Sequence, residues 1–152
     1  MAPRGPEAAA PQAFADAAGT AAPKAAGADH RQDAAPQVDG KPMWSASRRY
    51  SAEENAQRAF DKNGAAFGAR DVDDFVRKAH AFVDHPPREA LTLTRSNGDV
   101  LIYDPKANVF AVATKDGAPR TMFKPDDGMA YWQAQVDRDA ARRQAQAAKA
   151  EG

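Results

Sequence analysis

The chain contains no cysteine, few aromatic residues and no long hydrophobic run. Without cysteine it has no disulfide framework, no thiolate metal site and no cysteine nucleophile. No apolar run approaches the roughly 20 residues that a membrane-spanning helix needs. The N-terminus carries Arg4 but not the apolar segment of a Sec signal peptide. We therefore expect no membrane partner and no Sec-dependent export.

The sequence also lacks an excess of charge of either sign. It has 21 Lys and Arg residues against 21 Asp and Glu residues, so its formal net charge is +0. A basic field over the whole molecule, which would attract nucleic acid, is therefore missing. Any contact with nucleic acid must come from a local cluster of cations.

Composition divides the chain into three parts. Residues 1–42 are mainly Ala, Pro, Gly, Gln and Asp, and such a segment buries too little surface to offset its ordering entropy, so we predict disorder. The alternative is a short Ala-rich helix around residues 13–18. Residues 43–136 are expected to form one domain with a modest core. Residues 137–152 read as a charged helix or tail without an apolar stripe, which frays into solvent.

Two helices are expected at the start of the domain. Ser51 followed by Glu54 is a capping-box pattern and predicts a helix over residues 52–63, which Gly64 should end in a left-handed conformation. A second helix is predicted over residues 71–85, because its apolar residues recur at helical spacing. These residues are Val72, Phe75, Val76, Ala79, Phe82 and Val83.

After residue 90 the hydrophobic period changes from helical to alternating, which is typical of strands. The predicted strands are Leu91–Thr94, Val100–Tyr103, Val109–Thr114 and Arg120–Phe123. Asn97 and Gly98 indicate a hairpin, because both residue types accept positive φ. Connections this short allow only antiparallel neighbours. The expected fold class is α+β, with N-terminal helices packed on a four-stranded antiparallel meander sheet and a disordered segment before them.

Cations and one hydroxyl group are the candidates for chemistry. We expect a twisted sheet to bring Arg95, Thr121 and the end of the first helix, with Lys62 and Asn63, around one concave face. Such groups would stabilise charge on a phosphodiester during cleavage.

Each candidate also has a structural interpretation. Lys62 and Asn63 favour a helix C-terminus, and cations such as Arg120 and Lys124 protect edge strands from aggregation.

Metal and cofactor chemistry is not indicated. His80 and His85 are five residues apart and have no evident third ligand, so a zinc site is not expected. His80 borders the apolar face of its helix and is interpreted as a packing residue. The carboxylate pairs lie at helix starts, where the helix dipole explains them. We therefore expect no metal and no cofactor.

Residues 57–132 as a whole resemble a toxin domain found at the C-termini of Rhs/YD-repeat, LXG and related polymorphic toxins. The family pattern has a helix ending in His-x-x-Lys-His-Gly-x-x-Phe, then R-x-NGD, Y-D-P-x-x-N and R-T-x-F-K-P stretches. The corresponding segments here are Ala59–Phe67, Arg95–Asp99, Tyr103–Phe110 and Arg120–Pro125. The domain is similar to the metal-independent RNases that include barnase, colicin D and RelE.

The resemblance implies RNA cleavage by attack of the 2′-hydroxyl, with tRNA as one candidate substrate, after secretion or delivery into a target-cell cytoplasm. It also implies a cognate immunity protein as a partner. The catalytic positions would be Lys62, Asn63, Arg95 and Thr121, and the substrate-binding positions would be Arg120, Lys124 and Asn97.

This chain departs from the pattern where proton transfer would occur. Ala59 and Asn63 stand where the family has histidines, and Ala66 stands where it tends to have an acid. Loss of a general acid or base costs roughly 10²–10⁴-fold in rate, so we expect a weakened or inactive RNase. The alternatives are a non-catalytic module that binds an immunity or other partner protein, and a structural or chaperone-recognised effector whose function resides in its N-terminal segment.

Overall fold

The computed structural model describes residues 29–31 and 33–151. Most of the predicted disordered segment, residues 1–28 and 32, lies outside the described residues. A hairpin comes first, followed by two helices, a four-stranded sheet and a long C-terminal helix. The elements are β1 (Gln37–Val38), β2 (Lys41–Pro42), α3 (Ala52–Asn63), the 3-10 turn η1 (Gly64–Phe67), α4 (Val72–Asp84), β3 (Leu91–Thr94), β4 (Val100–Asp104), β5 (Val109–Ala113), β6 (Pro119–Phe123) and α5 (Met129–Glu151).

The sheet is an antiparallel meander in the order β3-β4-β5-β6, and the predicted α+β class is confirmed. Its register aligns Leu91 with Tyr103, Tyr103 with Phe110, and Phe110 with Phe123. The first hairpin turn differs from the prediction, because only Gly98 has a positive φ, of 96°. Asn97 instead accepts a hydrogen bond from the backbone N–H of Asp99 at 2.9 Å, which closes an Asx turn.

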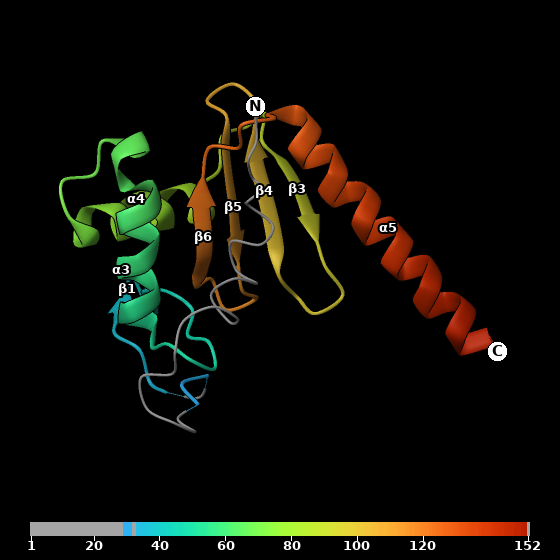
Figure 1. Ribbon diagram of the computed structural model, residues 1–152, viewed down its shortest axis with the longest axis horizontal. Helices are drawn as coiled ribbons and strands as arrows, with labels where there is room; N and C mark the ends of the chain where they lie inside the picture. Colours follow the sequence, from blue (N-terminus) through green and yellow to red (C-terminus); the bar gives the residue numbers. More distant parts are fainter. Residues whose placement is uncertain (1–28, 32, 152) are drawn as a thin grey trace.

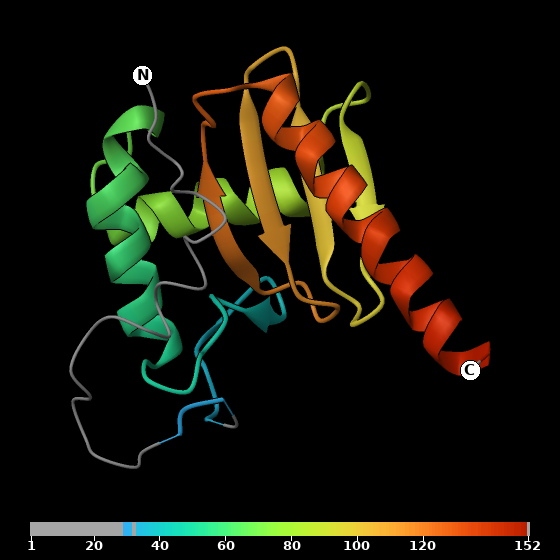
Figure 2. The same cartoon turned by 45° about the vertical axis from the view of Figure 1, so that its right-hand side comes forward.

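Both faces of the sheet are covered, giving three layers (Figures 1 and 2). Helices α3 and α4 pack on one face, where Phe75 and Ala79 meet Ala111 and Met122. Helix α5 packs on the other face. There the buried side chains are Leu101, Tyr103, Phe110, Val112, Phe123 and Trp132. The prediction placed only the N-terminal helices on the sheet, yet the wholly buried β5 requires a cover on each face.

Helix α5 is one continuous element, and no break separates residues 136 and 137. Trp132 stacks on Tyr103 with ring centroids 6.3 Å apart. One turn past the predicted boundary, Asp139 is 5% exposed and accepts from Arg143 Nε at 2.7 Å. Arg143 also donates to the carbonyl of Thr94 at 2.7 Å. The helix therefore packs on the sheet as far as Asp139, and Arg143 ties the next turn to β3. Residues 140–149 are all exposed, and the end of the helix extends beyond the sheet (Figure 1).

The beginning of α3 agrees with its prediction and its end does not. Ser51 and Glu54 form the expected reciprocal capping box. Gly64 has a φ of −58° and continues into η1, and the left-handed residue is Gly68, with a φ of 65°. Gly64 is needed for close packing instead, because a Cβ there would collide with the ring of Phe60.

The hairpin of β1 and β2 replaces the disorder predicted up to residue 42. Asp39 and Gly40 both have positive φ, 53° and 81°, which is the geometry of an Asp-Gly hairpin turn. The Asp39–Gly40 dipeptide is a sequence signal for such a turn, and the prediction of disorder did not take it into account. Lys41 forms an ion pair with Asp84 at 2.8 Å, which ties the hairpin to α4.

Candidate functional site

Most of the predicted site residues lie at two opposite ends of the sheet, and Thr121 lies in its middle. The first group surrounds η1, where Lys62 is exposed at the end of α3 and Asn63 is the N-cap residue of η1. Lys124 follows β6 and places its Nζ 5.4 Å from the ring centroid of Phe67. Two cations and an amide therefore gather at the end of the sheet where β6 finishes.

The second group lies where β6 begins, beside the hairpin of β3 and β4. Arg120 Nε is 3.1 Å from Asp99 Oδ2, and the side chain of Asn97 donates to the same oxygen at 3.3 Å. A register shift between Val112 and Ala113 inserts Arg120 as an extra residue in β6. Simple alternation along a strand would place Arg120 and Lys124, four residues apart, on one face, and this bulge removes Arg120 from that alternation.

Thr121 is enclosed by the fold. It is 5% exposed and pairs with Val112 in the middle of the sheet, on the face that α5 covers. Arg95 belongs to the loop after β3, at the opposite edge of the four-strand order. The structure therefore does not gather Arg95, Thr121 and the end of α3 around one concave face.

Arg95 is part of the seam between the hairpin and α5. Its Nη2 donates to Gln135 Oε1 at 3.5 Å. Burial lowers the pKa of Arg95, and the nearby charge of Arg142 lowers it further. Burial likewise raises the pKa of Tyr131 above its ordinary range. Both shifts have burial as their largest cause, so they mark a desolvated polar contact between the hairpin and α5.

Residues 59, 63 and 66 carry no group that could transfer protons near neutral pH. His80 is 2% exposed, and its Nε2 lies 3.0 Å from the carbonyl oxygen of Met43, as expected for a packing residue. Ala59 packs against the core on the α3 side, and neither its side chain nor that of Asn63 ionises. Within residues 29–31 and 33–151, no cluster of His, Cys, Asp and Glu could hold a metal ion.

The residues of the strand motifs are tied together by hydrogen bonds. Tyr103 Oη donates to Asn108 Oδ1 at 2.8 Å, and Asn108 Nδ2 donates to the carbonyl of Pro125 at 3.0 Å. Asn108 also adopts a positive φ of 59°, which asparagine tolerates better than most residues. Together with the Asp99–Arg120 ion pair, these bonds join three of the motif stretches across the sheet.

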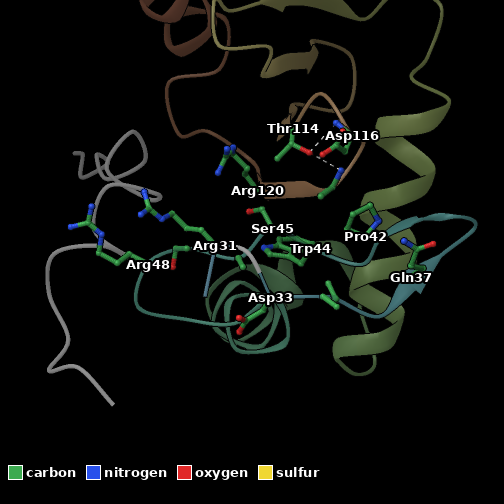
Figure 3. A pocket seen from close by; sticks show the side chains of 15 residues that line it. Arg31, Asp33, Gln37, Pro42, Trp44, Ser45, Arg48, Thr114, Asp116 and Arg120 are labelled. Atoms are coloured by element: carbon green, nitrogen blue, oxygen red, sulfur yellow. Dashed lines mark hydrogen bonds between the residues drawn. The ribbon is translucent and has the colours of Figure 1, made fainter. Parts of the chain in front are cut away.

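A hollow of about 580 Å³, lined by polar and apolar side chains together, lies at the end of the sheet where β6 begins (Figure 3). The segment of residues 31–48 forms one side and the turn between β5 and β6 forms the other. Arg31, Arg48 and Arg120 line it together. Sequence reasoning considered only Arg120 of these, because no local pattern shows that residues 31 and 48 meet a turn that is distant from both in the sequence.

The chain matches no family model, and no curated protein matches it. None of the helices in the described part of the chain is long and apolar enough to cross a membrane.

Proposed function

We propose that the chain is a toxin-type RNase-fold domain that binds RNA and cleaves it weakly or not at all. The observation that carries the proposal is the network of motif residues, Asp99 with Arg120 and Tyr103 with Asn108. Each of these residues has a structural partner. A chain that has lost its catalytic groups would still need them, because they hold the hairpin, the turns and the sheet in register.

The catalytic deficit lies at α3. An RNase of this kind needs a base to accept the 2′ proton and an acid to protonate the leaving 5′-oxygen. Ala59 and Asn63 provide neither, and Ala66, exposed in η1, replaces the expected acid. Lys62 remains at the same place with its charge, so this end of the sheet keeps a phosphate contact without the groups that move protons.

RNA affinity would come from local cations. Contacts of Lys and Arg with phosphates release counterions, so each contact in single-stranded RNA adds about 0.7 to the slope of log affinity against log salt concentration. Lys62 and Lys124, both exposed near η1, suit such contacts. Affinity that is independent of salt would contradict this mode of binding.

Restoring the missing groups tests the catalytic part of the proposal. The double variant Ala59→His with Asn63→His should cleave RNA in vitro and arrest growth when expressed, whereas the unaltered chain should do neither efficiently. The same double variant with Lys62→Ala serves as the matched control and should no longer cleave RNA or arrest growth. A folded double variant that leaves both total RNA and tRNA intact would refute the nuclease ancestry.

A partner-binding module is the second candidate, and the exposed part of α5 favours it. Residues 140–149 carry Arg142, Arg143 and Lys149 and no acidic side chain, so this part of the helix suits an acidic partner such as an immunity protein. Charge reversal at Arg142 and Lys149 should then abolish co-purification with an acidic protein encoded beside this chain. If charge reversal abolishes the complex and the unaltered chain binds no RNA, partner binding is favoured over the first function.

A further inference from the structure

The hollow in Figure 3 has walls that are held in place by hydrogen bonds. On one wall, the side-chain amide of Asn55 donates to the carbonyl of Ser45 and to Ser47 Oγ, both at 3.2 Å. On the other, Thr114 Oγ1 accepts from the backbone N–H of Ala118 at 3.1 Å. A ligand entering the hollow would therefore meet preformed walls, which lowers the entropic cost of binding.

Positive charge collects on one side of this hollow. Figure 3 shows the guanidinium ends of Arg31, Arg48 and Arg120 on the same side. Arg31 pairs with Asp29 at 2.6 Å. Arg120 meets Asp99 through its Nε, which leaves its two terminal amino groups for a second anion, since a guanidinium has five N–H donors. Arg48 is exposed and adds the third charge.

Asp29 and Asp99 offset the charges of Arg31 and Arg120 in these pairs, so the surplus of positive charge on this side is that of Arg48. Asp33 Oδ2 lies 2.8 Å from His30 Nδ1 and is engaged in this contact. Asp116 lies away from the three guanidinium groups in Figure 3. Ser45 and Ser47 also line the hollow, and their hydroxyl groups can donate to phosphate oxygens.

The lining also indicates which part of a nucleic acid would fit. Trp44 lines the hollow but is only 1% exposed, so it offers no open ring on which a base could stack. Guanidinium and hydroxyl groups recognise phosphate oxygens and ribose hydroxyls. The volume of about 580 Å³ is within the range of sites that take small ligands, which suits a short stretch of backbone.

We propose that this hollow binds the sugar-phosphate backbone of single-stranded RNA through Arg31, Arg48 and Arg120. The inference rests on the RNA binding proposed above and assigns it a second surface, at the end of the sheet away from Lys62. Binding here is independent of base sequence, because backbone contacts carry no sequence information.

Arg48→Ala is the decisive variant, because this exposed side chain can be removed without disturbing the core. Lys106→Ala is its matched control: it removes the same charge from an exposed turn between β4 and β5, at the other end of the sheet. Fluorescence anisotropy with a labelled single-stranded RNA, measured over a range of salt concentrations, reports both affinity and slope. Backbone amide shifts of Ser45, Ser47 and Thr114 report the place of binding.

We expect Arg48→Ala to weaken RNA binding about three- to tenfold and to lower the salt slope by about 0.7, the value of one phosphate contact. Lys106→Ala should leave the affinity within twofold of the unaltered chain. If the unaltered chain binds RNA but Arg48→Ala equals Lys106→Ala and the three amides do not shift, the hollow is not the site and the proposed function still stands. If the unaltered chain binds no RNA at low salt, the proposed function itself fails.

Discussion

Substitution of Trp132 by alanine should strongly destabilise the domain. Trp132 is 6% exposed and lies between α5 and the sheet, with its ring centroid 6.3 Å from that of Tyr103 and 6.4 Å from that of Phe110. These contacts attach the first half of α5 to the face of the sheet opposite α4. Their loss removes apolar surface from the core and leaves a cavity.

The size of the effect follows from the buried area. A buried tryptophan removes about 150–250 Å² from water, which at about 25 cal/mol per Å² corresponds to about 4–6 kcal/mol. The denatured chain already buries part of this area, so the figure falls by about 10–40%. The expected loss is about 3–5 kcal/mol, which agrees with typical values for Trp→Ala in cores. The free energy of unfolding of a folded domain is typically about 5–15 kcal/mol in total, so this loss is a large part of it.

Urea denaturation monitored by Trp44 fluorescence tests this expectation. The chain has two tryptophans, so in Trp132→Ala the signal comes from Trp44 alone, which packs on the opposite face of the sheet. Met129→Ala is the control, because Met129 begins the same helix but is 48% exposed, and it should cost less than about 1 kcal/mol. If both variants unfold at the same urea concentration, α5 is a frayed tail and the three-layer description is wrong.

Three smaller perturbations have equally definite outcomes. Ser51→Ala removes the N-cap of α3 and should cost about 0.5–2 kcal/mol in chemical denaturation; an unchanged midpoint would show that the cap contributes nothing. Tyr103→Phe leaves Asn108 Oδ1 without its donor and should lower the free energy of unfolding by about 1–3 kcal/mol in chemical denaturation; an unchanged midpoint would show that this hydrogen bond contributes nothing. The hydrogen bond from the backbone N–H of Arg70 lowers the pKa of Asp74 below 3.8. The stabilisation by the ionised Asp74 is therefore complete above pH 3.8 and is lost as the pH falls through the lowered pKa. The melting temperatures of Asp74→Asn and the unaltered chain should differ at neutral pH and converge in acid. A difference in melting temperature that does not change with pH would contradict the assignment.

Local signals in the sequence determined most of the elements. The capping box of Ser51, the apolar face of α4 and the turn residues between the strands each act within a few positions of the chain. Such signals depend on backbone geometry and on contacts one helical turn or one strand pair away. This is why the boundaries of α4 and the order of the meander could be predicted without any knowledge of distant contacts. The Asp39–Gly40 turn carried a signal of the same local kind.

The site could be predicted only as a set of residue types. The twist of the predicted sheet was expected to bring Arg95 and Thr121 together from its first and last strands, but the environments of these residues depend on packing. The bulge at Arg120 turns that side chain toward Asp99, and α5 covers the face on which Thr121 lies. Neither the bulge nor the cover has a pattern within the strand itself.

The sequence by itself determined the helices, the strands and the absence of proton-transfer groups at residues 59 and 63, since these follow from residue types and short spacings. Only the tertiary structure decided that α5 closes the second face of the sheet. Its apolar residues end at Val136, too early for helical periodicity to mark the whole element. The tertiary structure also separated Lys62 from Arg95 and brought Arg31 and Arg48 to Arg120, because long-range packing, which no local pattern encodes, sets these distances.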